Sequence, residues 1–149
     1  MKSPSFTGLR PASAASSSAK KANRSCDTAH ERLLRQELWR RGLRYRKNVS
    51  QLPGKPDIVF TRGRVVVFCD GDFWHGRSWP KLARQLRGGA NSSYWREKIR
   101  SNMLRDRHIT QLLKRQGWRV IRMWEGEINA NPQHAAQYVA KIISARRSL

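Results

Sequence analysis

Residues 65–69 restrict the possible folds of this chain most strongly, because all of them are apolar: Val-Val-Val-Phe-Cys. A strand that is apolar on both faces must be covered on both faces, so it belongs inside a sheet flanked by helices. Residues 57–60 form a second strand candidate before it, and residues 61–64 suit a hairpin turn. The two segments therefore predict an antiparallel hairpin whose second strand is central in the sheet.

Three segments have helical periodicity and recognisable ends. The first begins with the capping-box spacing of residues 28–31 and ends at Gly42. The second is a long helix from residues 91–92 to 116, followed by a glycine. The third starts at residues 131–132, where proline suits the first turn. Their apolar stripes predict helices that pack against the sheet.

Two more strand candidates complete the fold. Residues 45–49 suit a short strand and residues 118–124 a strong one, whereas residues 71–90 are basic, aromatic and without periodicity, which predicts a loop. The order of elements predicts an α/β fold, with a single domain over residues 27–149 and a small mixed β-sheet flanked by helices. Residues 1–26, rich in Ser, Ala and Lys, predict a disordered basic N-terminal arm.

Positive charge dominates the composition. Lys and Arg number 31 against 10 Asp and Glu, a formal net charge of +21. Such a chain attracts phosphate groups, which predicts nucleic-acid binding, although a cationic structural protein of ribosomal type has the same signature. No stretch approaches the roughly 20 apolar residues of a membrane span. The two cysteines do not suggest a disulfide framework, so a cytoplasmic location is expected.

Oxygen ligands for a metal ion converge at one end of the predicted hairpin. Asp57 opens the first strand, and antiparallel pairing brings it beside Cys69 and Asp70 at the end of the second. Two carboxylates and the Cys69 carbonyl suit a hard cation such as magnesium, completed by substrate phosphate. The alternative for Asp57 alone is a structural aspartate in a turn.

Two more side chains could take part in chemistry there. His75 follows Asp70 in the loop and could act as a general base, because an imidazole can take a proton from water at neutral pH. Its alternative is an ordinary surface histidine. Glu31 completes the capping box, yet it also shares the apolar face of its helix. An inward carboxylate needs a partner, so Glu31 is predicted to serve the cap or the site.

Several side chains could touch nucleic acid. Asn102 and Asp106 lie on the buried stripe of the long helix and need polar partners. Asn102 could read a base edge, or the two could pair with each other in the core. Phe73, Trp74 and Trp95 could be core residues, or they could wedge between base pairs.

These residues stand in an ordered set of short motifs. In chain order they are Asp27-Thr28-Ala29-His30-Glu31-Arg32-Leu33, Leu52-Pro53-Gly54-Lys55-Pro56-Asp57-Ile58-Val59-Phe60, Phe73-Trp74-His75-Gly76, Tyr94-Trp95-Arg96-Glu97-Lys98-Ile99, Asn102 with Arg105-Asp106-Arg107, and Gly117-Trp118-Arg119-Val120 with Trp124-Glu125. The set resembles the very-short-patch-repair (Vsr-type) DNA mismatch endonucleases. The resemblance implies a restriction-endonuclease-like fold and a metal-dependent endodeoxyribonuclease.

The resemblance also implies roles for the site residues. Asp57 would be the principal magnesium ligand, Cys69 would add its backbone carbonyl, and Asp70 would lie beside them as a further ligand. His75 would activate the attacking water, with Glu31 and Asp70 assisting. The ion would polarise the phosphate and stabilise the leaving oxygen.

The implied substrate is double-stranded DNA with a T:G mismatch left by deamination of 5-methylcytosine, nicked 5′ of the thymine. Phe73, Trp74 and Trp95 match the intercalating aromatics of the family, and Lys98 and Asn102 match residues near the mismatched pair. A monomer associated with the nucleoid is expected, with mismatch-repair proteins as further partners. The alternatives are a nuclease with another DNA target and a non-catalytic DNA-binding relative.

This chain departs from the resemblance at two places. Family members commonly carry a structural zinc, but the corresponding positions here are Asp72, Arg77, Trp79 and Gly126. Tetrahedral zinc needs four Cys or His ligands, so we predict no zinc and expect the loop to be held by packing, for instance by Trp79 and Trp124. The second departure is a carboxylate, that of Asp70, where some relatives have histidine.

Overall fold

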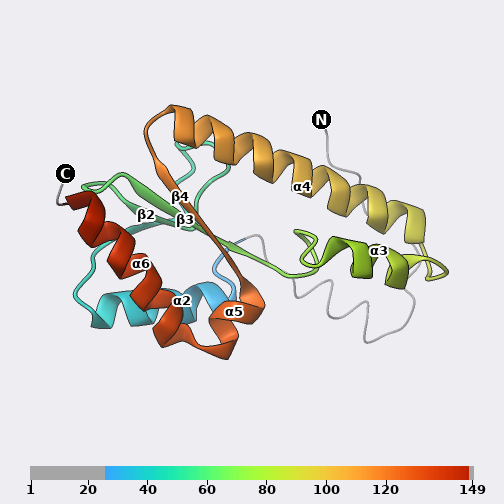
Figure 1. The fold of residues 1–149 in the computed structure, drawn as a ribbon, viewed down its shortest axis with the longest axis horizontal. Coiled ribbons are helices and arrows are strands. Elements are labelled where there is room, and N and C mark those ends of the chain that lie inside the picture. The colour runs from blue at the N-terminus through green and yellow to red at the C-terminus, as the bar shows by residue number, and fades with distance from the viewer. Residues whose placement is uncertain (1–25, 148–149) are drawn as a thin grey trace.

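The computed structural model describes residues 26–147, so the predicted arm lies outside the described residues except for Cys26. The helices in Figure 1 are α2 (Ala29–Arg40), α3 (Trp79–Leu86), α4 (Ser92–Arg115), α5 (Glu125–Ala130) and α6 (Pro132–Arg147). The strands are β1 (Arg46–Lys47), β2 (Ile58–Phe60), β3 (Val65–Asp70) and β4 (Arg119–Trp124). Within the described residues, no helix combines the length and the apolar character needed to cross a bilayer.

The strands form one mixed sheet in the order β1-β2-β3-β4. β2 and β3 pair antiparallel with Phe60 opposite Val65, which confirms the predicted hairpin. β4 pairs parallel to β3, from Val65 opposite Arg119 to Asp70 opposite Trp124. β3 is buried along its whole length and has a neighbour on each side, as its apolar composition predicts. The predicted α/β class, a small mixed sheet flanked by helices, is confirmed.

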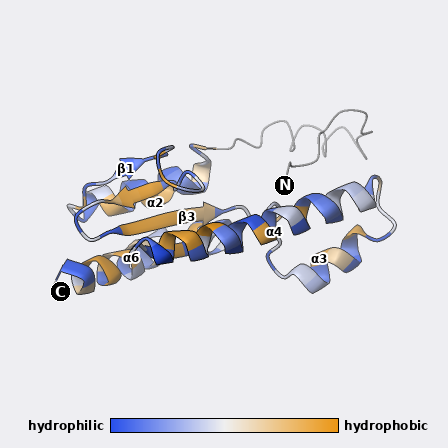
Figure 2. Cartoon of the chain, turned by 90° about the horizontal axis from the view of Figure 1, so that it is seen from above, coloured by the Kyte–Doolittle hydropathy of each residue, from blue (hydrophilic) through white to orange (hydrophobic). Residues whose placement is uncertain are grey.

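Helices cover both faces of this sheet (Figure 1). α2, α5 and α6 pack over one face, which includes Val67, and α4 covers the other, where its Leu113 joins Val66 and Phe68. Side chains alternate between the two cores because successive residues of a strand point to opposite faces. Asp70 is in step with Phe68, so it ends β3 on the α4 face. Figure 2 shows α4 and α3 extending beyond the end of β3.

The predicted starts of α2, α4 and α6 and the predicted ends of α2 and α4 are confirmed, but two helices were not predicted. α3 lies within residues 71–90, which were expected to form a loop. It has eight residues, none of them fully buried. Its half-buried residues recur at the i, i+3, i+4, i+7 spacing of a helix, a pattern that the loop prediction missed: Trp79, Leu82, Ala83 and Leu86. α5 has six residues and buries only Ile128.

Candidate active site

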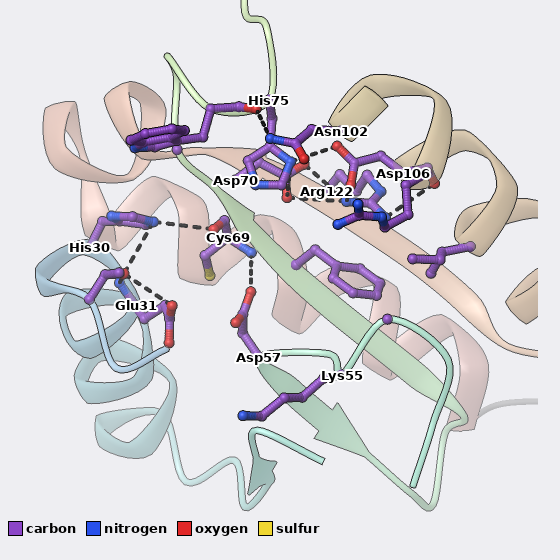
Figure 3. A pocket seen from close by; sticks show the side chains of 17 residues that line it. His30, Glu31, Lys55, Asp57, Cys69, Asp70, His75, Asn102, Asp106 and Arg122 are labelled. Carbon is purple, nitrogen blue, oxygen red and sulfur yellow. Dashed lines mark hydrogen bonds and ion pairs between the residues drawn. The ribbon is translucent and has the colours of Figure 1, made fainter. Parts of the chain in front are cut away.

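A pocket of about 490 Å³ opens where β3 ends and β2 begins, between the start of α2 and the middle of α4 (Figure 3). It brings together most of the predicted site residues. Its wall includes Thr28, His30, Glu31, Lys55, Asp57, Cys69, Asp70, Trp74, His75, Asn102, Arg105, Asp106 and Arg122. Lys98, Phe73 and Trp95 do not line it.

Asp57 occupies the middle of the pocket, directly before β2. Its Oδ2 accepts a hydrogen bond of 2.7 Å from the Cys69 backbone N–H, which is the convergence that the hairpin predicted. The pKa of Asp57 is raised to about 7, mainly by burial and also by the charges of Glu31 and Asp70. The hydrogen bond from Cys69 opposes this rise. Among the described residues, no Lys, Arg or His lies within ion-pair distance of this carboxylate.

This donor set fits a hard divalent cation. A largely buried carboxylate without a cationic partner is costly, and a bound cation would relieve that cost. The Cys69 carbonyl lines the same pocket, where His30 Nε2 lies 3.2 Å from its oxygen. A carbonyl oxygen has two lone pairs, so it can accept from His30 and still face an ion. Asp57 and Cys69 together therefore offer two oxygen ligands.

Glu31 caps the N-terminal end of α2 and lines the same pocket. Its carboxylate accepts hydrogen bonds from Thr28 Oγ1 at 3.1 Å and from the Asp27 N–H at 2.9 Å, and its own N–H donates to the Thr28 hydroxyl. The predicted Thr28–Glu31 cap is therefore present, although the Glu31 carboxylate accepts the N–H of Asp27 rather than that of Thr28. The side chain is only 2% exposed, and Arg35 lies 3.5 Å away as a counter-charge. Glu31 serves the cap while it faces Asp57.

Asp70 is paired with Arg122, a residue that was not predicted for the site. Arg122 Nη1 lies 3.1 Å from Asp70 Oδ1 and 3.2 Å from Oδ2. Burial raises the pKa of Asp70, while the charges of His75 and Arg122 oppose the rise. The carboxylate therefore belongs to an ion pair on the α4 face. An arginine in the middle of a largely apolar strand, on the same face as its neighbours Val120 and Trp124, was the signal available in the sequence.

His75 is held by Asp106 of α4. Its Nδ1 lies 2.6 Å from Asp106 Oδ2 and 3.8 Å from Asp70 Oδ1. Burial lowers the pKa of His75, but the hydrogen bond to Asp106 and the charge of Asp70 outweigh it, so the pKa lies above 6.5. Because a carboxylate only accepts, Nδ1 carries the proton and the lone pair of the neutral ring is on Nε2. The alternative in which Asn102 pairs with Asp106 is wrong, because Asp106 pairs with His75.

The aromatic residues form one cluster beside the pocket. Phe73, Trp74 and Trp95 make edge-to-face contacts with centroids 5.2 to 5.8 Å apart. Trp95 is buried, whereas Phe73 and Trp74 are half-buried. Asn102 Nδ2 donates to the Trp74 carbonyl at 2.8 Å, which ties the aromatic turn to α4. In the free protein these side chains pack against one another.

A polar clip holds the turn that carries His75. Asp72 Oδ1 accepts the Gly126 N–H at 3.3 Å, and Arg77 Nη1 lies 3.4 Å from the same carboxylate. The Asp72 N–H in turn donates to Glu125 Oε1 at 3.1 Å. These contacts join the loop after β3 to the start of α5, at positions where the resemblance would place zinc ligands. The absence of zinc stays a prediction.

We expect Asp72→Ala to cost activity more than stability. The carboxylate is 37% exposed, so its loss should lower the free energy of unfolding by only about 1 kcal/mol. The turn that carries His75 would loosen, and nicking should fall about 10-fold. Urea unfolding and a nicking assay measure the two effects. Arg40→Ala, which removes an exposed pair with Glu37, is the control and should leave nicking unchanged. An equal response of both variants would contradict the clip's role.

Comparison with known proteins identifies the family of this chain. The model of the family DNA mismatch endonuclease Vsr matches residues 12–81. The chain is 38% identical to the type II nicking enzyme V.NmeDIP of Neisseria meningitidis serogroup C, over 86% of this chain and 85% of the relative. It is 35% identical to the type II nicking enzyme V.HpaIIP of Haemophilus parainfluenzae, over 85% and 89%. It is 37% identical to the DNA mismatch endonuclease Vsr of Escherichia coli (strain K12), over 66% and 62%. The chain therefore belongs to the Vsr family of DNA endonucleases.

Proposed function

We propose that this chain is a magnesium-dependent endonuclease that nicks one strand of double-stranded DNA 5′ of the thymine in a T:G mismatch, through a domain formed by residues 27–149. One observation carries the catalytic part of the proposal. The unpaired carboxylate of Asp57 and the His75–Asp106 pair face a single pocket. Family membership supports DNA as the substrate.

Asp57 and the Cys69 carbonyl would hold the ion. Bound there, Mg²⁺ supplies polarisation of the phosphodiester and stabilisation of charge on the leaving oxygen. Asp57 binds it as the ionised carboxylate, and its hydrogen bond from the Cys69 N–H keeps it oriented. Asp70, predicted as a further ligand, has both oxygens within 3.2 Å of Arg122, so it would reach the ion only if that pair opened.

His75 would act as the general base. Its Nδ1–H donates to Asp106, so the ring is held in one orientation and the neutral form presents a lone pair on Nε2. The Asp106 carboxylate then stabilises the imidazolium that forms when the ring takes a proton. Asp70 and Glu31 assist by adding negative charge around the pocket, Asp70 at 3.8 Å from His75.

DNA would approach across α3 and α4. Arg105 of α4 lines the pocket wall, and the half-buried Phe73 and Trp74 lie beside it. These two rings, with Trp95 behind them, would open the stack at the mismatch, while Lys98 and Asn102 would contact the mismatched pair. Insertion requires the aromatic cluster to separate from its self-packed arrangement, which favours steps that stack weakly.

The test compares four duplexes of one sequence that carry T:G, T:A, C:G or T:T at a single position. With Mg²⁺ we expect one nick 5′ of the thymine in the T:G duplex, at least about 100-fold faster than in T:A, and no nick in EDTA. Denaturing gels of end-labelled strands locate the cut. Equal cleavage of the matched duplexes would overturn the mismatch specificity but not the nuclease. Absence of metal-dependent cleavage on every duplex would overturn the enzyme.

The sequence around the mismatch is tested in the same way. Several relatives are named type II nicking enzymes, a name that does not itself mention a mismatch. A set of T:G duplexes with varied flanking bases would show whether the chain requires a particular sequence context. Nicking confined to one context would narrow the proposed substrate.

A further inference from the structure

The guanidinium of Arg122 is held in place by several contacts besides its ion pair with Asp70. On the strand β4, its Nε donates to Thr110 Oγ1 at 2.8 Å and its Nη2 to the Asp106 carbonyl at 3.2 Å. Its guanidinium carbon lies 4.1 Å above the centre of the Phe68 ring. An arginine held by a hydroxyl, a carbonyl and an aromatic face has one available orientation.

That orientation places a positive charge between two carboxylates. Arg122 Nη1 lies 3.1 Å from Asp70 Oδ1 and 3.6 Å from Asp106 Oδ1. His75 lies against the same two carboxylates, and ligand atoms of Asp70, His75 and Asp106 all fall within 4.8 Å of one another. Two carboxylates and an imidazole at that spacing have the composition of a divalent-metal site.

We propose that Arg122 is a built-in cation that excludes a divalent metal from the Asp70–His75–Asp106 cluster. The guanidinium occupies the position at which a divalent ion would bind both carboxylates. The ion and the guanidinium are both positive, so they cannot lie there together in a partly buried site. The cluster is therefore reserved for proton transfer at His75, and a divalent ion is left with Asp57. This inference rests on the proposed function in naming Asp57 as the ion's ligand and His75 as the general base.

Arg122 is by the same contacts a positioning residue. It acts on the reaction through Asp106, whose carbonyl and carboxylate it holds, and Asp106 orients His75. Lysine at this position would keep the charge beside Asp70, but its single ammonium cannot hold Thr110 and Asp106 in the same planar fork. Charge and geometry can therefore be separated by substitution.

The experiment counts Mn²⁺ ions, the metal alone serving as probe, by electron paramagnetic resonance of the free ion and by titration calorimetry. We expect Arg122→Met to bind one more Mn²⁺ per chain than the wild type at the same free concentration, because Asp70 and Asp106 are no longer neutralised by an arginine. Arg122→Lys should bind the wild-type number and show reduced kcat. Arg119→Met is the matched control, since Arg119 is an exposed arginine of the same strand, and it should bind the wild-type number.

Two further variants protect the test. Arg122→Met removes the arginine that Asp70 and Asp106 share and could fold poorly. It is therefore also combined with Asp70→Asn, which removes one carboxylate and should abolish the extra ion. The count is repeated in an Asp57→Asn background, where Arg122→Met should still add one ion. If Asp57→Asn alone binds as many Mn²⁺ ions as the wild type, Asp57 is not the proposed ligand. The comparison between Arg122→Met and the wild type would still stand. A wild-type count for Arg122→Met, or an extra ion that persists with Asp70→Asn, overturns the role of Arg122.

Discussion

Asp57→Asn should abolish metal-dependent nicking while making the metal-free protein more stable. Asparagine can still accept the Cys69 N–H, but it cannot supply the charge that holds a divalent ion. Loss of the ion's several kcal/mol of charge stabilisation corresponds to a rate lower by about 1,000-fold or more. Single-turnover nicking of the T:G duplex at saturating Mg²⁺ measures it.

The stability gain follows from the raised pKa of Asp57. In the folded protein this pKa is about 7, against 3.8 for an ordinary aspartate, so the folded state binds its proton more tightly than the unfolded state. The stabilising effect of that proton is fully present below the unfolded value and is lost as the pH rises to 7 and beyond. At pH 8 in EDTA, Asp57→Asn should therefore melt at a higher temperature than the wild type, and the gap should close near pH 4.

Magnesium should reverse the order of the two melting temperatures. A ligand that binds only the folded state stabilises it, so Mg²⁺ should raise the melting temperature of the wild type and leave Asp57→Asn unmoved. Glu127→Gln, an exposed carboxylate outside the pocket, is the control and should behave like the wild type in every arm. An Asp57→Asn protein that is less stable than the wild type at pH 8 without metal, or that Mg²⁺ still stabilises, would show that Asp57 is a structural turn residue.

Local patterns in the sequence were enough to predict the frame of the site. The apolar run of β3 implied a central strand, and the hairpin then placed Asp57 beside Cys69, a contact that the structure has as a 2.7 Å hydrogen bond. The capping box located Glu31 at the start of α2. Each of these inferences depends on residues close in sequence or on one antiparallel pairing, so few alternatives compete with it.

The partners of Asp70 and His75 could not be predicted in this way. Arg122 meets Asp70 only because β4 runs parallel to β3 in one register, a pairing across 52 positions that no local pattern determines. Asp106 meets His75 because α4 crosses the end of the sheet above the loop. Asp106 was expected to need a polar partner, for which Asn102 was one alternative, whereas the fold supplied His75.

His75→Ala should lower the single-turnover rate by about 100- to 10,000-fold, the usual contribution of a general base. The pH profile identifies the role more specifically. At saturating Mg²⁺ Asp57 is ionised, so the acidic limb of the wild-type profile should report His75, with a pKa above 6.5 because the hydrogen bond to Asp106 and the charge of Asp70 outweigh burial. The rate should therefore rise as pH increases through that value, as neutral imidazole becomes available.

Asp106→Asn separates the general base from its support. The amide can keep a hydrogen bond to His75 but removes the negative charge that raises the pKa of the ring, so the acidic limb should move to lower pH while the plateau rate falls. His134→Ala, which removes an exposed histidine of α6, should change neither feature. If the acidic limb keeps its pH in Asp106→Asn, or is still present in His75→Ala, the limb reports another group. His75 would then only position the aromatic turn.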